Sequence, residues 1–306
     1  MKTALFKRWL NILTGKSATA VRQGKGKFYA VDKIKGYYND LTLKVGNGTE
    51  LDADGIPVSE ISSGEKVHFP IAVFQYGLAQ NDLYLENQKS EHLDSLKKIA
   101  DWAIENQRDD GSWDAFGPMK SKKYTVSSMC QGEGASLLFR AGILFGDDKY
   151  TKAGFRAVDF MLKPISEGGT ADYSEEKLYL EEYPQVPRRS VLNGWIFSIF
   201  GLYDAAILYE DYEDYFDVTV DTLLSELDNY DNGYWSLYDR QGKIASPAYH
   251  DLHIALLEVL SDITLKPDFS EKGKKFESYR KHNKPRAVIK KLMQKLTEDT
   301  DVVVVK

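Results

Sequence analysis

The sequence of 306 residues has one cysteine, Cys130, and this scarcity excludes a disulfide framework and a zinc site built from cysteine thiolates. It suits a reducing compartment. Long apolar runs are missing too, since stretches such as Trp195–Leu202 fall short of the ~20 residues that a membrane-spanning helix needs. An excess of positive charge is also lacking, because the formal net charge is −6. Nucleic acid is therefore not expected as the main partner.

What the chain does contain is ordinary globular composition, with 42% hydrophobic and 28% charged residues. At about 150 residues per domain the length fits two units or one large helical domain. The 19 tyrosines outnumber the 14 phenylalanines. Because tyrosine joins an apolar ring to a hydroxyl group, this excess favours a polar ligand that stacks on rings, such as a sugar.

The N-terminus has no secretory signal pattern, because Lys7 and Arg8 interrupt the stretch that should be apolar. We therefore expect a cytoplasmic protein. Leu5, Phe6 and Trp9 fall on one helical face, which predicts a short helix packed on the domain. A peripheral membrane anchor is the alternative interpretation of the same face.

Residue periodicity then divides the chain. Strand-forming residues in Phe28–Val31 and Tyr37–Val45, with turn residues at 46–48 and Asp52–Gly55, predict a small β-hairpin segment. From about residue 66 the period becomes helical. Helices are expected near 67–80, 93–104, 123–145, 148–163, 187–210, 212–229, 248–264 and 285–297. The predicted organisation is a helix and connector at 1–26, a β segment at 27–65, a helical domain at 66–265 and a basic helical tail at 266–306.

Two turns between helices repeat one pattern, in Asn106–Trp113 and Asp228–Trp235. In both, an Asp/Asn pair precedes glycine and tryptophan follows two residues later, so that the tryptophan can fold back on the helix pair. The spacing of Gln107, Gly111 and Trp113 resembles the turn of α/α-toroid enzymes, which include terpene cyclases. The Asp-x-Asp-Asp motif of those cyclases is absent from the sequence. The turns thus predict a mainly α fold, an (α/α) toroid, without terpene chemistry.

The tail is strongly basic. Between Lys272 and Lys295 there are ten lysines and arginines and a single acid, Glu277. Such a run is typical of a solvated helix face, and the alternatives are contact with an anionic polymer or with an anionic membrane surface.

Several stretches combine residues that could carry chemistry. Glu182 and Tyr183 precede two prolines at the mouth of a predicted helix, in which Asn193 needs a partner if it is buried. A plain surface loop is the alternative for this pair. Tyr238 and Arg240 could hold a carboxylate, with a structural Asp239–Arg240 pair as the alternative.

A further stretch opens with Tyr249 and His250. His250 and His253 share a helix face but lack a third ligand for zinc, so that hydrogen bonding to a polar ligand or capping of the helix is expected instead. Gln131 stands in a Gln-Gly-Glu-Gly run whose two glycines indicate close approach to a helix backbone.

Together these stretches resemble the D-glucuronyl C5-epimerase family. The resemblance covers roughly residues 36–265 and follows the family's order, with Glu181–Asp204 the most specific part. In that family an (α/α) toroid follows β-rich domains and inverts C5 of glucuronate in a heparan-type precursor polymer, giving iduronate. The resemblance implies no metal and no cofactor.

Proton removal beside a carboxylate leaves an enolate-like intermediate, and a proton must return from the opposite face. Tyrosine, with an ordinary pKa of ~10, is expected to need neighbouring cations to act at working pH. The resemblance implies that Glu182, Tyr183 and Tyr249 are catalytic. It implies that substrate is bound by Gln131, Asn193, Tyr238, Arg240 and His250. Because the protein is net negative and the substrate is an anion, a local positive surface is also expected, and Arg188 or Arg189 are further candidates to line it.

The chain departs from the family pattern in places. Phe197 stands where the family can carry tyrosine, Pro247 and Ala248 replace a Trp-Asp pair, and most of the β-rich N-terminal region is missing. We therefore expect a bacterial-type short member acting on an anionic glucuronate-containing glycan. A uronate polysaccharide lyase and a non-catalytic glycan-binding toroid are the alternatives. A homodimer and peripheral membrane contact through the N-terminal helix or basic tail stay open.

Overall fold

The computed structural model describes residues 23–46, 49–61 and 63–297 of this protein. The predicted helix over Leu5, Phe6 and Trp9 lies outside the described residues. Among the described helices none is long and apolar enough to cross a membrane.

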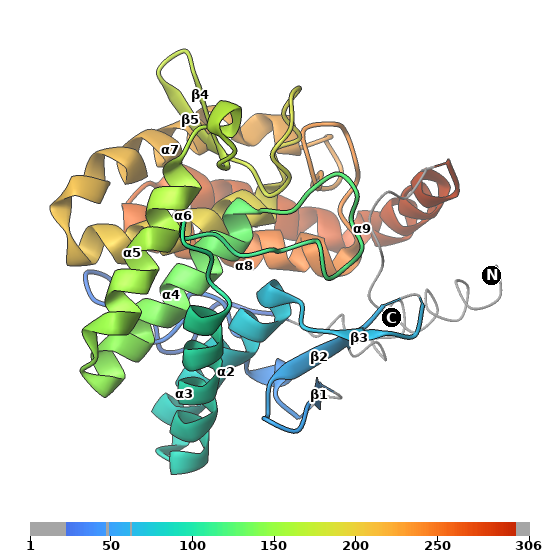
Figure 1. The fold of residues 1–306 in the computed structure, drawn as a ribbon. Coiled ribbons are helices and arrows are strands. Elements are labelled where there is room, and N and C mark those ends of the chain that lie inside the picture. The colour runs from blue at the N-terminus through green and yellow to red at the C-terminus, as the bar shows by residue number, and fades with distance from the viewer. Residues whose placement is uncertain (1–22, 47–48, 62, 298–306) are drawn as a thin grey trace.

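Helical hairpins dominate the described part of the chain (Figure 1). Each pairs a more buried helix with a more exposed one: α2 (Pro70–Asn87) with α3 (Ser90–Glu105), α4 (Ser128–Phe145) with α5 (Asp148–Leu162), α6 (Leu192–Leu208) with α7 (Glu213–Glu226), and α8 (Pro247–Thr264) with α9 (Pro267–Thr297). Among the buried helices, α4 packs against α2 and α6, and α6 also packs against α8. This succession of inner and outer helices confirms the predicted mainly α, toroid-type fold.

The inner helices α4 and α6 are buried on all sides. Every residue in 128–142 and in 192–205 is buried, whereas α3 and α5 bury a single apolar stripe. Glycine brings α4 and α6 close together, since a Cβ added to Gly201 would lie 2.4 Å from the Gly132 carbonyl oxygen. This close approach accounts for Gly132 in the run singled out from the sequence.

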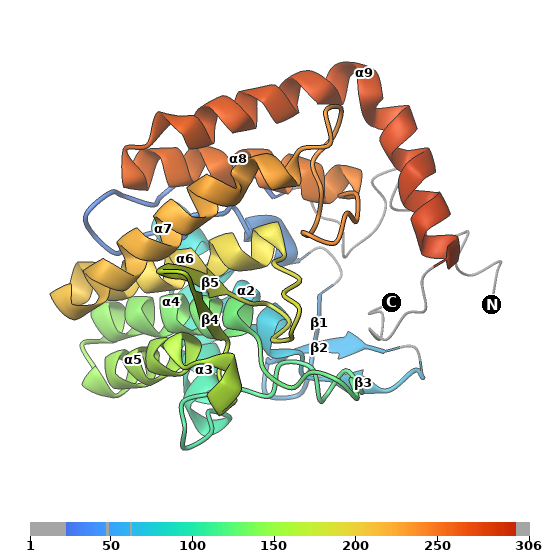
Figure 2. The same cartoon turned by 90° about the horizontal axis from the view of Figure 1, so that it is seen from above.

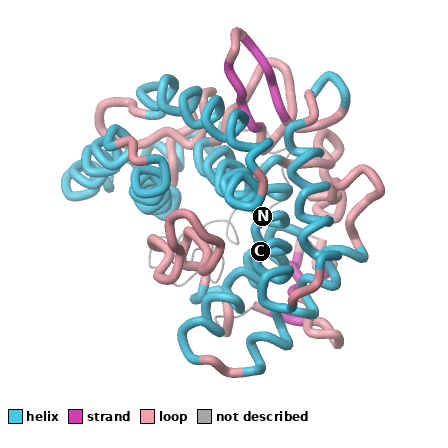
Figure 3. Tube along the Cα trace, turned by 90° about the vertical axis from the view of Figure 1, so that its left-hand side faces the viewer, coloured by secondary structure: helices cyan, strands magenta, loops and turns pink. Residues whose placement is uncertain are grey.

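Two small antiparallel sheets lie at separate edges of the helical array (Figure 3). One contains β1 (Glu50–Leu51), β2 (Pro57–Glu60) and β3 (Lys66–Val67), and the other is the hairpin of β4 (Ala171–Ser174) and β5 (Lys177–Leu180). The predicted turn at Asp52 joins β1 to β2, and its carboxylate accepts a hydrogen bond from the Ile56 N–H at 2.8 Å. The β4–β5 hairpin packs on α7 and was not expected from the sequence.

The prediction of strands at 28–31 and 37–45 is wrong. This stretch has isolated bridges and a 3₁₀ turn at Thr42–Lys44, because its aromatic residues pack on helices rather than in a sheet. The Tyr38 ring lies 4.7 Å from that of Phe200 on α6, between centroids. The Tyr37 N–H donates to the Asp82 carboxylate of α2 at 2.9 Å.

Helix α9 begins at Pro267, earlier than the position near residue 285 expected from the sequence. Phe269 and Phe276 are fully buried in its first half and join the main core. Pro285 stands inside the helix, which changes direction along its length (Figure 2). The division of the chain into four units stays a prediction.

The two tryptophan turns differ in their partners. Trp113 Nε1 donates to the Ala103 carbonyl of α3 at 2.8 Å, as expected for a ring that folds back on the preceding helix. Trp235 Nε1 instead donates to the Ala245 carbonyl, just before α8, at 3.0 Å. In each turn the tryptophan indole therefore donates to a backbone carbonyl, but the first carbonyl precedes the turn and the second follows it.

A buried ion pair joins the inner helices to the N-terminal segment. Arg140 Nη1 of α4 lies 2.6 Å from Asp204 Oδ2 of α6, and both side chains are almost fully buried. The Tyr38 hydroxyl donates to Asp204 at 2.7 Å, and Arg140 Nη2 donates to the Gly36 carbonyl at 2.9 Å. Three distant parts of the chain thus meet at one pair of charges.

We predict that Asp204→Asn lowers the free energy of unfolding by about 3–5 kcal/mol, because it leaves the Arg140 charge buried without its counter-ion. Urea denaturation followed by circular dichroism measures the change. The double variant Arg140→Met/Asp204→Leu, which removes both charges, should lose less. An equal or larger loss in the double variant would contradict the argument, and Asp211→Asn on the exposed surface is the control.

Candidate active site

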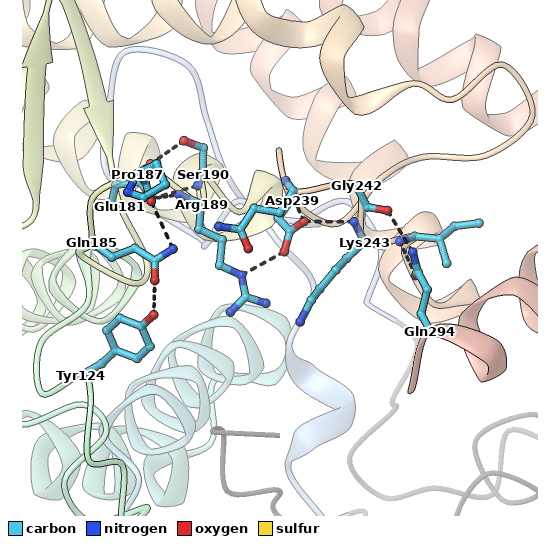
Figure 4. A network of polar contacts seen from close by, with 12 residues as sticks. Tyr124, Glu181, Gln185, Pro187, Arg189, Ser190, Asp239, Gly242, Lys243 and Gln294 are labelled. Atoms are coloured by element: carbon cyan, nitrogen blue, oxygen red, sulfur yellow. Dashed lines mark hydrogen bonds and ion pairs between the residues drawn. The ribbon is translucent and has the colours of Figure 1, made fainter. Parts of the chain in front are cut away.

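The loop between β5 and α6 carries two of the predicted catalytic residues, and Glu181 ties its ends together. The Glu181 carboxylate accepts hydrogen bonds from the Ser190 N–H at 2.9 Å and the Arg189 N–H at 3.2 Å (Figure 4). Glu182 and Tyr183, which follow Glu181 directly, therefore extend from an anchored backbone.

A second segment lies against the end of this loop. The Leu192 N–H donates to the Tyr238 carbonyl and the Arg240 N–H to the Arg189 carbonyl, each at 3.0 Å. Asp239, which is fully buried, accepts a hydrogen bond from Arg189 Nε at 2.9 Å (Figure 4). This ion pair fixes the direction of the Arg189 side chain.

Two tyrosines lie against that guanidinium group, and a third packs on one of them. The Arg189 Cζ atom lies 4.7 Å from the ring centroid of Tyr183 and 5.8 Å from that of Tyr238. The rings of Tyr238 and Tyr249 meet edge to face, with centroids 5.1 Å apart. Tyr183 is 8% exposed and Tyr249 is 40% exposed. The structure therefore brings Tyr183, Tyr238 and Tyr249 from three separate segments into one cluster, with Arg189 against the first two.

The Glu182 carboxyl group is buried next to these rings. Its Oε2 atom has no hydrogen-bond partner among the described residues. Gly194 makes room for it, since a Cβ added there would lie 2.3 Å from that oxygen. Burial raises the pKa of Glu182 to about 7, although hydrogen bonding with Tyr183 and the charge of Arg189 oppose the rise. At neutral pH, both the acid and the carboxylate are therefore populated.

Two further buried acceptors lie on the inner helices. Asn193 Oδ1 on α6 and Glu133 Oε2 on α4 lack partners among the described residues, while Glu133 Oε1 accepts from Gln75 Nε2 at 2.9 Å. Burial raises the pKa of Glu133 to about 8; the Gln75 hydrogen bond and the Lys44 charge oppose this rise, and the charge of Glu182 adds to it. A buried polar atom without a partner is costly, so these atoms suit the donors of a bound ligand.

The tyrosines do not have the lowered pKa values that the sequence led us to expect. Burial raises the pKa of Tyr183 and of Tyr238 well above the ordinary value, and it raises that of Tyr249 to about 12. The charge of Glu182 adds to each rise, and Arg189 offsets only part of it at Tyr183 and Tyr238. Neutral phenols, rather than phenolates, therefore occupy the site at pH 7.

The comparison with known families concerns this part of the chain. The model of the D-glucuronyl C5-epimerase C-terminus matches residues 107–278, which is more than half of the chain and includes the three tyrosines and Glu182. This chain belongs to that family. The D-glucuronyl C5-epimerase of Caenorhabditis elegans is 28% identical over an alignment that covers 58% of this chain and 34% of the relative. The chain thus matches about a third of the length of this epimerase.

Solved structures resemble this epimerase-family chain more loosely. A polysaccharide lyase superposes with a TM-score of 0.43 and 16% identity, covering 70% of this chain and 28% of its own. The unsaturated glucuronyl hydrolase of Bacillus sp. GL1 superposes with a TM-score of 0.45 and 14% identity, covering 74% and 61%. Both TM-scores are below 0.5, so these structures superpose only partly on this epimerase-family chain.

Gln131, expected to bind substrate, is directed away from the tyrosines. Its side chain is fully buried and accepts from the Trp113 N–H at 3.1 Å, while Nε2 donates to the carbonyls of Gly111 and Ala157. With both donor hydrogens used on backbone, Gln131 holds the tryptophan turn against α4 and α5 instead.

His250 likewise has an internal place. Its ring stacks on Trp235 at 3.7 Å between centroids, and its two nitrogens contact Ser236 and the Phe276 carbonyl oxygen. Burial lowers the pKa of His250 to about 4, so that it is neutral and cannot supply positive charge. Among the described residues, no group of three His, Cys, Asp or Glu side chains could hold a metal ion.

Arg240 is also removed from the tyrosines. Its guanidinium group pairs with Glu226, which is bound in turn by Lys177 and by the hydroxyl of Tyr179. Its neighbour Asp239 forms an isolated bridge with Val191 and binds Arg189, whereas Arg240 stands in the turn that follows. Arg189, one of the two alternatives considered from the sequence, takes the expected position beside Tyr183.

Glu133 was missed as a candidate. Its signal in the sequence is an acid between two glycines inside an apolar helix. Gly132 and Gly134 let the backbone of α6 and the Trp113 ring approach, with added Cβ atoms at 2.7 Å and 2.6 Å from their nearest neighbours. A side chain between two such contacts is necessarily buried.

We predict that Glu133→Gln stabilises the protein at neutral and alkaline pH. The folded pKa lies above the unfolded value of ~4.3, so the wild type loses stability as pH rises from about 4 to 8, by roughly 1.4 kcal/mol per pH unit in that window. The variant should lose that slope, and its advantage should grow between pH 5 and pH 8 in urea denaturation. Glu258→Gln, on the exposed side of α8, is the matched control. Parallel stability profiles against pH for wild type and Glu133→Gln would show that the pKa of Glu133 is not raised in the folded protein.

Proposed function

We propose that this chain is a uronyl C5-epimerase that inverts C5 of D-glucuronate residues in an anionic glycan, giving L-iduronate. The observation that carries the proposal is the cluster in which Arg189 contacts Tyr183 and Tyr238, Tyr238 contacts Tyr249 at the start of α8, and the buried Glu182 carboxyl lies beside Tyr183. Membership of the epimerase family supports the same chemistry. No cofactor enters the proposed reaction.

Arg189 is the proposed site for the substrate carboxylate. The protein is net negative, so an anionic sugar needs a local cation, and guanidinium binds carboxylates through paired hydrogen bonds. Asp239 orients this guanidinium from behind, leaving its terminal nitrogens for the ligand. Asn193 and the acid form of Glu182 could then bind the enolate oxygens as they gain charge.

Proton removal is proposed to start at the Tyr183–Glu182 pair. The Tyr183 oxygen takes the C5 proton while its own proton passes to the Glu182 carboxylate, so that Tyr183 stays neutral throughout. The relay is needed because the raised pKa of Tyr183 makes its free phenolate too scarce to serve as the base.

The return of a proton is assigned to Tyr249. Its hydroxyl donates to C5 from the opposite face, and the resulting phenolate recovers a proton from solvent, to which the side chain is 40% exposed. Glu182 releases its proton to solvent after the product leaves, which restores the starting state. Deuterium from heavy water should therefore appear at C5 of the product. By microscopic reversibility the reverse reaction follows the same steps backwards, with the Tyr249 phenolate as the base and Tyr183, supplied with a proton by Glu182, as the acid.

We predict that Tyr183→Phe and Tyr249→Phe each lower turnover by about 10²–10⁴-fold, the usual effect of losing a general acid or base. Binding should change little, because the rings and Arg189 remain. Inversion and deuterium incorporation at C5 are followed by NMR on a glucuronate polymer, starting from both epimers. Tyr215→Phe, on the exposed side of α7, is the matched control.

The products also distinguish the other chemical classes. A lyase would leave an unsaturated uronate end and shorter chains, and a binding module would leave the polymer unchanged. Either result with the wild type would overturn the proposed inversion. Near-normal inversion in both phenylalanine variants would instead refute the two-tyrosine assignment alone.

We further predict that the epimerase kcat/KM rises with pH through about 7, because only ionised Glu182 can accept the relayed proton and its ionised fraction grows above its pKa. Glu182→Gln should reduce the rate and remove this limb of the pH profile. An unchanged limb in Glu182→Gln would assign the titration to another group.

A further inference from the structure

The last part of α9 is basic and extends past the family match, which ends at residue 278. From Tyr279 to Gln294 it contains six lysines and arginines and no acid. Arg280 is paired with Asp251 and Glu277, but the exposed side chains of Lys281, Lys284 and Lys290 have no ion pair among the described residues. The positive charge of these three lysines therefore has no counter-ion among the described residues.

Exposed apolar side chains accompany these charges. Ile289 is 55% exposed and Met293 is 60% exposed. They are four residues apart and so form one row along the helix. The Arg286 guanidinium group packs on the Tyr234 ring instead, with its Cζ atom 3.8 Å from the ring centroid. We call five exposed residues of this segment the outer α9 face: Lys281, Lys284, Ile289, Lys290 and Met293.

The opposite side of the same segment is attached to the protein. Ala287 is fully buried in a small core with Trp235, and Gln294 exchanges hydrogen bonds with the backbone of Gly242 and Ile244 at 3.0 Å and 2.9 Å (Figure 4). The segment after the bend lies away from α3 and α5 in two views (Figures 1 and 2). The outer α9 face is thus held in place and turned away from the core.

We propose that the outer α9 face docks on the surface of an anionic phospholipid bilayer. The lysines would bind lipid headgroups, while Ile289 and Met293 would enter the boundary between headgroups and acyl chains. A dissolved polyanionic glycan matches the charges but offers no apolar phase to the two exposed aliphatic side chains, which is why the observations favour a membrane surface. The helix would lie on the bilayer, since it is far too polar to cross it.

The test is co-sedimentation of the full chain with phosphatidylcholine vesicles, with and without phosphatidylglycerol. Binding is expected only with the anionic lipid and should weaken with salt. Lys284→Gln/Lys290→Gln should weaken it by about 5-fold for each charge removed, about 25-fold in all. Ile289→Ser/Met293→Ser should reduce it further at high salt, where the charges are screened.

The control is Lys98→Gln/Lys152→Gln, which changes net charge equally on α3 and α5, away from the end of α9. It should bind vesicles like the wild type. Equal loss in both double variants would overturn the proposal in favour of a general charge effect. Retention on a glucuronate polymer but not on vesicles would overturn it in favour of a glycan-binding helix. None of these outcomes depends on epimerase activity.

Discussion

The contact between Arg140 and Asp204 is the constraint on which the rest of the structure depends. It pairs two charges almost without solvent, which is stable only when the remaining hydrogen-bonding groups are satisfied. Ser136, Tyr38 and the Gly36 carbonyl supply most of those bonds, while Arg140 Nε has no partner among the described residues, and α4, α6 and the N-terminal segment are thereby held in one arrangement. The acidic side chain of Glu133 and the amide of Asn193 extend from these same two helices. The relative position of the site's buried acceptors thus follows from an ion pair that takes no part in the proposed chemistry.

Electrostatics within the site follow one pattern. Burial raises the pKa of the tyrosine phenols and of Glu133 and Glu182, while the Asp239 carboxylate directs the Arg189 guanidinium group. The phenols and Glu133 therefore keep their protons near neutral pH, and Glu182 is present in both forms. The arrangement suits a reaction in which a proton leaves and returns while an anionic sugar brings the negative charge.

Much of this could be predicted from the sequence, and the failures have physical causes. The helical period, the Asp52 turn and the convergence of Glu182, Tyr183, Tyr238 and Tyr249 were all expected. Gln131 and His250 were misplaced because a buried polar side chain needs a partner, and sequence does not tell a ligand from the backbone carbonyls that they in fact contact. Arg240 was expected beside the tyrosines, but Arg189 lies there and Arg240 pairs with Glu226. Which arginine reaches the tyrosines depends on how two segments far apart in the chain pair with each other, and the sequence does not give that pairing. Tyr37 and Tyr38 resembled strand residues because the same ring fits a sheet or the face of a helix.

The contact between Gly132 and Gly201 has a consequence for engineering the site. A methyl group at either position would have to push a backbone carbonyl aside, and since both helices are buried on every side, the whole of α4 or α6 would have to shift. Such a shift would change the separation of Glu133 and Asn193 without altering either residue. The spacing of those two side chains therefore depends on the absence of a methyl group at the contact between the two helices.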